Sequence, residues 1–245
     1  MKSENLKTTT LLKAPVYEVF FSYQGEGLYT GLPQIFVRFA GCNIKCGYCD
    51  TSYSHTVSGK TKYYTTEQLI KKIEKIFLKN KKNFNAGKPS MSITGGEPLI
   101  YANFLAALLP ELKKKGFEIY LETNGTLPGN LKRIINFCDI ISMDFKFASE
   151  CRKNFWKEHK QFLKTAVKKE TQVKCVITGN TLLSEIKECA KTVKSVSKKI
   201  PIILQPSIDK SIPHIKHLYI FYKELKQSLD NVFVMPQMHK IMKYK

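Results

Sequence analysis

Short apolar runs alternate with longer segments of helical periodicity along most of this 245-residue chain. The apolar runs are four to six residues long and are rich in Ile, Val and Phe, which is typical of buried strands. We predict six strands, at residues 34–39, 91–94, 118–122, 140–144, 172–177 and 200–205. Strands that alternate with helices form parallel βαβ units with right-handed crossovers. The pattern therefore predicts an α/β fold.

Amphipathic helices are predicted between these strands. The clearest covers residues 66–78, where Thr65 and Gln68 have the spacing of a capping box. Further helices are predicted at residues 104–115, 130–137, 152–169, 184–198 and 213–229. Six strands of this kind form either an open doubly wound sheet or an incomplete parallel (β/α) barrel, and the pattern does not separate the two.

The chain shows no low-complexity linker and no repeat of fixed period. We therefore predict that residues 1–245 form a single domain, with a C-terminal extension from about residue 230. The first residues are polar and lack an apolar core, so they do not resemble a signal peptide. No apolar stretch approaches the roughly 20 residues that a membrane span requires. We expect a cytoplasmic protein in which the seven cysteines remain reduced.

Polar residues and glycines follow directly after five of the predicted strands. These segments are a cysteine-rich loop, Thr94–Pro98, Glu122–Gly125, Ser142–Lys146 and Gln205–Pro206. Glycine pairs and Asn-Gly are also ordinary turn signals, but five such segments share one position relative to the strands. Because the carboxyl ends of parallel strands meet at one rim, we predict a shared binding site there.

The cysteine-rich loop reads GCNIKCGYCDT and contains Cys42, Cys46 and Cys49. A structural zinc site and a ferredoxin-type cluster each normally take four protein ligands. Either His55 supplies the fourth ligand of a zinc site, or the metal keeps one position open for a group that is not protein. The remaining cysteines stand singly and are predicted to be ordinary buried thiols; they are Cys138, Cys151, Cys175 and Cys189.

The net charge is +20, which raises the question of a nucleic-acid partner. The basic residues are mostly lysines scattered over predicted helices without interleaved aromatic residues, so we interpret them as a solvated surface and disfavour nucleic acid. Arg38 differs because it lies inside the apolar run PQIFVRFAG. Its guanidinium either binds a ligand or forms a structural ion pair.

The cysteine spacing, together with the segment Gly95-Gly96-Glu97-Pro98, resembles the radical S-adenosylmethionine enzymes. The resemblance implies a [4Fe-4S] cluster on Cys42, Cys46 and Cys49, with the fourth iron chelated by S-adenosylmethionine. One-electron cleavage of that cofactor releases a 5′-deoxyadenosyl radical, so a fourth cysteine ligand would block the chemistry. The resemblance further implies that the cofactor is bound by Tyr48, Cys49, Asp50, Gly96, Glu97, Asn124, Ser142, Lys146 and Gln205.

The stretch FFSYQGEGLYTGLPQIFVRFAGCNIKCGYCDT, from Phe20 to Thr51, is similar to the 7-carboxy-7-deazaguanine synthase family. That family converts 6-carboxy-5,6,7,8-tetrahydropterin to 7-carboxy-7-deazaguanine with loss of ammonia, on the route to queuosine and other deazapurines. The resemblance implies Mg²⁺ at Thr51, an electron donor such as flavodoxin or ferredoxin, and a homodimer. It assigns substrate binding to Tyr23, Gln24, Gly25, Glu26, Arg38 and Thr94.

The resemblance weakens towards the C-terminus. Many members carry Ser-Pro-Lys where this chain has Ser142-Met143-Asp144-Phe145-Lys146, and the sequence leaves open whether Asp144 or Lys146 replaces the usual lysine. The segment Pro236–Lys240 resembles the C-terminal signature of the family, but a role for His239 stays open.

Two other classes of protein remain alternatives at this point. A glycyl-radical-enzyme activase also has three closely spaced cysteines, yet it acts on a protein and has no evident need for Gln24–Gly27 or Arg38. A zinc-dependent nucleic-acid-binding protein would account for the charge and the cysteines but not for the glycine segments at the strand ends. Metal content separates this last class from the other two.

Overall fold

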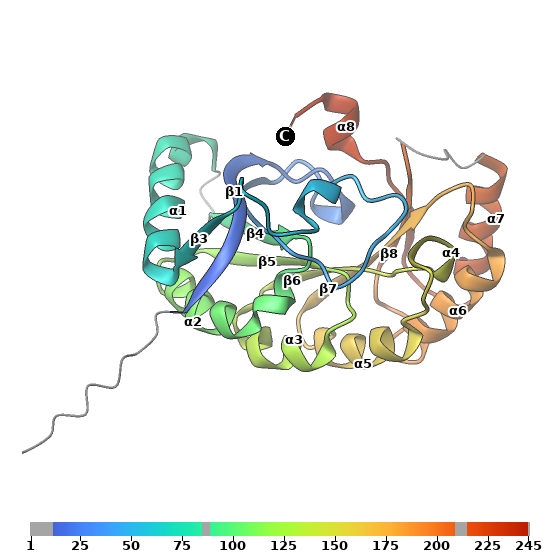
Figure 1. The fold of residues 1–245 in the computed structure, drawn as a ribbon. Coiled ribbons are helices and arrows are strands. Elements are labelled where there is room, and N and C mark those ends of the chain that lie inside the picture. Colours follow the sequence, from blue (N-terminus) through green and yellow to red (C-terminus); the bar gives the residue numbers. More distant parts are fainter. Residues whose placement is uncertain (1–11, 85–88, 209–214, 245) are drawn as a thin grey trace, which may run out of the picture.

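A nine-stranded sheet forms the centre of the computed structural model, which describes residues 12–84, 89–208 and 215–244 (Figure 1). Its strand order is β3-β1-β2-β4-β5-β6-β7-β8-β9. The six predicted strands are all confirmed, and neighbouring strands among them pair in parallel. They are β2 (Pro33–Phe39), β4 (Ser90–Gly95), β5 (Glu118–Thr123), β6 (Ile140–Asp144), β7 (Glu170–Ile177) and β8 (Ile202–Pro206).

Three further strands were not predicted. The strand β1 (Lys13–Tyr23) lies antiparallel between β2 and β3 (Lys62–Thr65), and β9 (Val232–Val234) extends the other edge in parallel with β8. Much of β1 is only half-buried, so it lacks the continuous apolar run by which the central strands are recognised. The strand β9 has three residues, which is too few to show a periodicity.

The main helices lie in an arc along one side of the sheet (Figure 1). They are α1 (Thr66–Asn80), α2 (Ala102–Lys114), α3 (Pro128–Ile134), α5 (Trp156–Ala166), α6 (Leu183–Lys194) and α7 (Ile215–Lys226). Single 3-10 turns connect several elements: η1 (Gly27–Tyr29), η2 (Ser52–Ser54), η3 (Lys81–Asn83), η4 (Pro98–Tyr101) and η5 (Ile135–Phe137). No helix within the described ranges is both long and apolar enough to cross a membrane.

The structure confirms the predicted start of α1 but not the predicted ends of α5. The capping box at α1 is confirmed, since the Gln68 backbone N–H donates to Thr65 Oγ1 at 3.2 Å and Gln68 Oε1 accepts from the Thr65 N–H at 3.0 Å. The helix predicted over 152–169 is confirmed as α5, but it is shorter than predicted at both ends. A short separate helix, α4 (Ala148–Cys151), ends where Arg152 adopts a left-handed φ of 56°, and α5 begins only at Trp156. The predicted start of the 213–229 helix falls outside the described residues.

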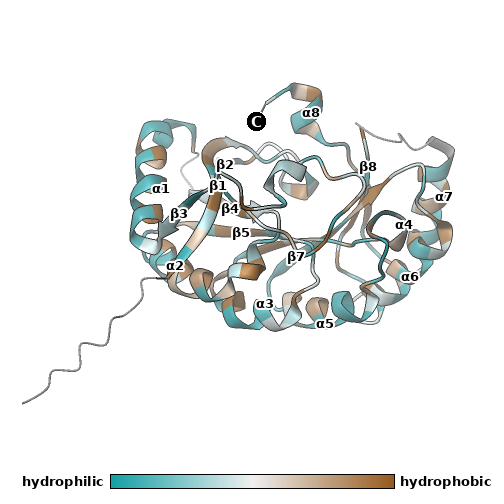
Figure 2. Cartoon of the chain, in the orientation of Figure 1, coloured by the Kyte–Doolittle hydropathy of each residue, from teal (hydrophilic) through white to brown (hydrophobic). Residues whose placement is uncertain are grey.

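The two faces of the central strands differ in polarity. Ile35, Val37 and Phe39 of β2 are fully buried in the apolar core. The central strands are rich in hydrophobic residues, whereas the helices alternate hydrophobic and hydrophilic positions (Figure 2). Alternate positions such as Gln34 and Ser92 are equally buried but polar. Because helices cover one face only and the edge strands β3 and β9 end the sheet, the fold is an incomplete (β/α) barrel with a polar interior.

The strand register sets side chains next to one another on that interior. Arg38 of β2 pairs with Thr94 of β4, and Asp144 of β6 pairs with Lys174 of β7. Arg38, Thr94 and Asp144 lie near the carboxyl ends of their strands, and Lys174 lies in the middle of the longer β7. The register thus places charged groups at one rim of the barrel.

Candidate functional site

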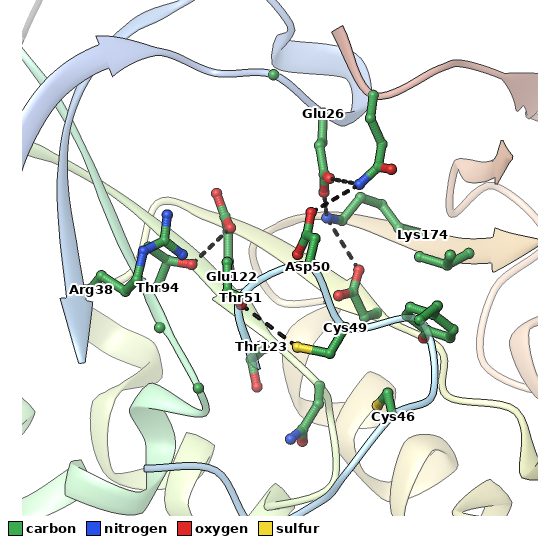
Figure 3. Close-up of a pocket in the computed structure, with 18 of the residues that line it drawn as sticks. Glu26, Arg38, Cys46, Cys49, Asp50, Thr51, Thr94, Glu122, Thr123 and Lys174 are labelled. Atoms are coloured by element: carbon green, nitrogen blue, oxygen red, sulfur yellow. Dashed lines mark hydrogen bonds and ion pairs between the residues drawn. The ribbon is translucent and has the colours of Figure 1, made fainter. Parts of the chain in front are cut away.

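One pocket at this rim contains the polar segments that follow the strands, so the predicted shared rim is confirmed (Figure 3). Of the residues assigned by resemblance, those that line the pocket are Tyr23, Gln24, Gly25, Glu26, Arg38, Cys42, Cys46, Tyr48, Cys49, Asp50, Thr51, Thr94, Gly96, Asn124, Lys146 and Gln205. Glu97 and Ser142 are fully buried and do not line it. The roles of all these residues stay predictions, which the geometry below makes testable.

The cysteine loop follows β2 and is seated against the glycine pair at the end of β4. A Cβ atom on Gly96 would lie 2.1 Å from the Gly41 carbonyl oxygen, so only glycine permits this contact. The Glu97 N–H donates to the same carbonyl at 2.8 Å. The glycine pair therefore fixes the position of the loop that carries the three cysteines.

The spacing of the three thiols distinguishes between the metal sites considered for this loop. A zinc–sulfur bond of about 2.3 Å places the thiolates of a tetrahedral site less than about 4 Å apart. Within the described residues, the only set of three or more Cys, His, Asp or Glu ligand atoms that all lie within 4.8 Å of one another is Glu26, Asp50 and His239. The cysteines and His55 thus do not form a mononuclear site. The three thiols line the pocket and are not all within 4.8 Å of one another, which fits an iron–sulfur cluster, a group larger than a single metal ion.

Two side chains make the shortest contacts with these thiols. His55 Nε2 lies 3.0 Å from Cys49 Sγ, and Cys151 Sγ lies 3.2 Å from Cys46 Sγ. The hydrogen bond from Cys151 lowers the pKa of Cys46 to about 7, although burial opposes this shift. The prediction of an ordinary buried thiol is wrong for Cys151, which is partly exposed and reaches the loop from the end of α4. It is confirmed for Cys138, Cys175 and Cys189, which are buried.

Glu97 lies beneath the pocket floor. Its carboxylate accepts hydrogen bonds from the Asn124 N–H at 2.7 Å, the Leu99 N–H at 3.0 Å and the Thr123 hydroxyl at 2.9 Å. Burial raises its pKa to about 7, against the effect of these donors. Glu97 therefore joins the end of β4 to the end of β5 and positions Asn124, whose amide lies 4.0 Å from Cys42 Sγ.

A buried row of alternating charges crosses the pocket from the cysteine loop to the segment after β1. Lys146 Nζ lies 3.1 Å from both the Tyr48 hydroxyl and Asp144 Oδ2. Asp144 Oδ1 also lies 3.2 Å from Lys174 Nζ, which forms an ion pair with Glu26. Although burial favours the neutral forms, the mutual attraction lowers the pKa of Asp144 and raises the pKa of both lysines. Asp144 and the two lysines are therefore charged.

The opposite wall of the pocket is built around Glu122, at the end of β5. Its carboxylate accepts hydrogen bonds from Gln24 Nε2 at 2.8 Å, Ser92 Oγ at 2.9 Å and Thr94 Oγ1 at 2.9 Å. Arg38 lies beside Thr94 on the same wall, with its Nε donating to Glu18 at 2.9 Å (Figure 3). Glu18 thus orients the guanidinium from one edge while the side chain lines the pocket.

Gln205, at the end of β8, has an unusual amide group. The residue is 1% exposed and lines the pocket, yet neither its Nε2 nor its Oε1 has a hydrogen-bond partner in the described structure. Leaving a buried amide unpaired costs about 1–3 kcal/mol per group, so this amide needs a partner that the described residues do not supply. Its N–H groups and its carbonyl oxygen can pair with a polar ligand in the pocket.

A C-terminal segment closes the top of the pocket. Gln237 Nε2 donates to Glu26 Oε1 at 2.8 Å and to Asp50 Oδ2 at 3.2 Å, and His239 lies 3.7 Å from Asp50. A Cβ atom on Gly25 would lie 2.5 Å from the His239 ring, so glycine is needed for this closure. The segment includes α8 (Met238–Met242) and belongs to the extension predicted from about residue 230.

Glu122, Lys174 and Gln237 were not among the predicted site residues. Lys174 could have been found, because a lysine inside the apolar strand QVKCVI is the same signal that singled out Arg38. Glu122 stands at a strand end, where the rim argument applies. Gln237 lies in the segment Pro236–Lys240, which resembles the C-terminal signature of the family, but its contact with the pocket depends on the path of the whole chain.

Comparison with known proteins gives two independent matches. The pattern of the radical SAM superfamily matches residues 36–195. The 7-carboxy-7-deazaguanine synthase of Geobacter sulfurreducens is 34% identical, over 94% of this chain and 97% of its own length. That of Methanothermobacter thermautotrophicus is 32% identical over the same shares of the two chains. The chain belongs to the 7-carboxy-7-deazaguanine synthase family.

The fold agrees with that assignment. The crystal structure of QueE from Escherichia coli covers 98% of this chain with a TM-score of 0.63 at 22% identity. Family membership implies a [4Fe-4S] cluster and S-adenosylmethionine, and the three wide-set thiols and the unpaired Gln205 amide fit these groups. Asp144 and Lys146 both line the pocket, with Lys146 Nζ 3.1 Å from Asp144 Oδ2. Which of the two replaces the usual lysine of the family stays open.

Proposed function

We propose that this chain converts 6-carboxy-5,6,7,8-tetrahydropterin to 7-carboxy-7-deazaguanine with loss of ammonia, in queuosine or deazapurine biosynthesis. The proposal depends on one observation: a single pocket combines the three-cysteine loop with a wall of Gln24, Arg38 and Glu122. That wall offers donors and acceptors for an aminopyrimidinone and a cation for a carboxylate. Relatives that carry the name of this activity match nearly the full length of the chain.

The chain's own residues would hold the cofactors in separate parts of the pocket. Cys42, Cys46 and Cys49 would ligate the cluster, Gln205 and Lys146 would bind polar groups of S-adenosylmethionine, and Thr51 would offer a hydroxyl to Mg²⁺. When bound, the cluster and S-adenosylmethionine supply a 5′-deoxyadenosyl radical able to take hydrogen from the substrate. The cofactor contacts predicted for Tyr48, Asp50, Gly96 and Asn124 are consistent with their places in the lining.

On the substrate side, Glu26 and Gln24 would bind the guanine-like edge of the pterin. Glu26 is held in place by its ion pair with Lys174, and Gln24 is oriented by Glu122, so both groups are fixed before the substrate arrives. Arg38 would bind the substrate carboxylate through its guanidinium, which Glu18 already orients. The substitution of any of these groups is therefore expected to affect substrate binding rather than cluster assembly.

A glycyl-radical-enzyme activase is not favoured. An activase must admit a segment of a protein to the cluster, whereas this pocket is closed over by Gln237 and His239 and lined by buried charges. These features suit a small polar molecule. The zinc-dependent alternative is not favoured either, because the thiols do not form a compact mononuclear site.

The proposal extends to the partners and the location of the protein. All seven cysteines are free thiols, which supports a reducing compartment such as the cytoplasm. An electron donor of the flavodoxin or ferredoxin type would reduce the cluster. The two sheet edges, β3 and β9, expose Tyr63, Phe233 and Val234, and a homodimer would cover such edges. The molar mass in solution, measured by light scattering at several concentrations, tests the homodimer.

An anaerobic assay tests the activity. The iron–sulfur-reconstituted protein is incubated with 6-carboxytetrahydropterin, S-adenosylmethionine, Mg²⁺ and a reductant, and products are identified by mass spectrometry. We expect 7-carboxy-7-deazaguanine in excess over the S-adenosylmethionine consumed, and none with Cys46→Ala. Cleavage of S-adenosylmethionine with the pterin untouched would reject this substrate and favour the activase.

A further inference from the structure

Two side chains outside the three-cysteine motif lie within 3.2 Å of its thiols. His55 Nε2 lies 3.0 Å from Cys49 Sγ, and Cys151 Sγ lies 3.2 Å from Cys46 Sγ. His55 follows η2 in the cysteine loop, whereas Cys151 ends α4 and is 105 positions from Cys46 along the chain. Two separate elements therefore each bring one polar hydrogen to a different thiol.

Backbone hydrogen bonds hold both contacts in place. The Cys42 N–H donates to the His55 carbonyl at 3.1 Å, and the His55 N–H donates to the Ser52 carbonyl at 3.1 Å. On the other side of the loop, the Gly47 N–H donates to the Glu150 carbonyl at 3.1 Å, next to Cys151. Because these bonds do not involve the thiols, the two side chains are positioned independently of what the thiols bind.

The direction of each hydrogen bond follows from the chemistry of ligation. A cysteine that binds iron does so as a thiolate and has no proton to donate. The proton in each contact must therefore come from the partner, as an N–H from His55 and an S–H from Cys151. Hydrogen bonds to the sulfurs of an iron–sulfur cluster are one of the factors that set its reduction potential. The reduced cluster carries one more negative charge, so donors stabilise it more than the oxidised cluster.

We propose that His55 and Cys151 are positioning residues that raise the reduction potential of the cluster by donating hydrogen bonds to Cys49 Sγ and Cys46 Sγ. This inference rests on the part of the proposed function that places a cluster on Cys42, Cys46 and Cys49. Both donors act through the ligands and do not need to touch the substrate. Their effect is to ease electron transfer to the cluster from a weakly reducing donor.

The test is a redox titration of the reconstituted full-length protein, with the reduced cluster followed by electron paramagnetic resonance. The variants are His55→Ala, His55→Gln, Cys151→Ala and Cys151→Ser, with Cys138→Ala as a control at a buried thiol away from the loop. Iron and sulfide analysis shows whether each variant retains its cluster.

We expect His55→Ala and Cys151→Ala each to lower the ratio of reduced to oxidised cluster about tenfold at a fixed potential, which is 59 mV for one electron. Their iron content should equal that of the wild type. His55→Gln and Cys151→Ser retain an N–H or O–H donor and should restore most of the loss, while Cys138→Ala should not shift the potential.

Three results would overturn the inference: unshifted potentials in variants with intact clusters, Gln and Ser variants that behave like the Ala variants, or loss of iron from Cys151→Ala, which would make Cys151 a ligand. Failure of the proposed function looks different. In that case the reduction potential of the cluster shifts in the variants as expected, but the wild-type protein leaves the carboxypterin unchanged. This result would rule out the proposed substrate and would still support the two hydrogen bonds.

Discussion

Lys174, in the middle of β7, forms an ion pair with Glu26, although 148 positions of the chain separate the two residues. The Lys174 side chain is only 4% exposed, and Asp144 lies on its other side. The ammonium therefore neutralises two carboxylates within the pocket. It also connects the segment after β1, which is expected to meet the substrate, to the far half of the barrel.

Replacing Lys174 with Met should lower both stability and substrate affinity. Removing one partner of a buried ion pair leaves an uncompensated charge, which costs about 3–5 kcal/mol. We expect a lower melting temperature and weaker pterin binding with unchanged iron content, measured by calorimetry and iron analysis. Lys71→Met is the control, because its ion pair with Glu67 is exposed and its loss should change the melting temperature little. Equal melting temperatures for the two variants would contradict the prediction.

Arg38→Ala should weaken binding of the substrate by about 2–5 kcal/mol, the usual cost of truncating a buried charge pair. The cluster should assemble normally, because Arg38 contacts Glu18 and not the cysteine loop. Arg133→Ala, on the exposed side of α3, is the matched control. Titration of each reconstituted variant with the carboxypterin gives the two affinities. Unchanged affinity in Arg38→Ala would remove this residue from the substrate site.

Gly96→Ala should displace the cysteine loop, because the added Cβ would lie 2.1 Å from the Gly41 carbonyl oxygen. We expect reconstitution to yield substantially less iron per chain than in the wild type. Gly59→Ala adds the same methyl group where no atom lies within 4 Å, so its iron content should be normal. Full iron loading of Gly96→Ala would show that the loop does not depend on this contact.

Glu97→Gln should change how stability depends on pH. Burial raises the pKa of Glu97 from 4.5 to about 7. A raised carboxyl pKa contributes stability that is present below pH 4.5 and is lost as the pH rises through about 7, because folding then requires a buried charge. The loss is about 3 kcal/mol at 1.36 kcal/mol per pH unit. Glutamine does not titrate.

Denaturant unfolding of the cluster-free protein at pH 5 and pH 8 measures this effect. The stability of Glu97→Gln relative to the wild type should increase between the two values. Glu111→Gln, whose side chain is exposed beside Lys114, serves as the control and should show little change. A constant difference between the Glu97 variant and wild type at both pH values would mean that Glu97 is charged in the folded protein throughout.

The central strands and the rim could be predicted because they depend on local signals. A buried parallel strand must be apolar along its length, so β2 and β4–β8 stand out, and strand ends identify the rim. The half-exposed antiparallel β1 has no such run. Cys151 could not be placed either, because its contact with Cys46 depends on where α4 ends, at the left-handed Arg152. Charges inside apolar strands proved the most reliable marker of the pocket, at both Arg38 and Lys174.

The closure of the pocket by Gln237 has a consequence for how the protein matures. Its contacts with Asp50 and Glu26 span 187 and 211 positions, whereas the cysteines and His55 lie within one short loop. Contacts of long span require costly loop closure and form late in folding. The thiols are thus available to an iron–sulfur donor at a stage when the lid over them has not yet formed. In this order of events, the cluster is delivered before Gln237 closes the pocket, so the two are separate steps of biogenesis.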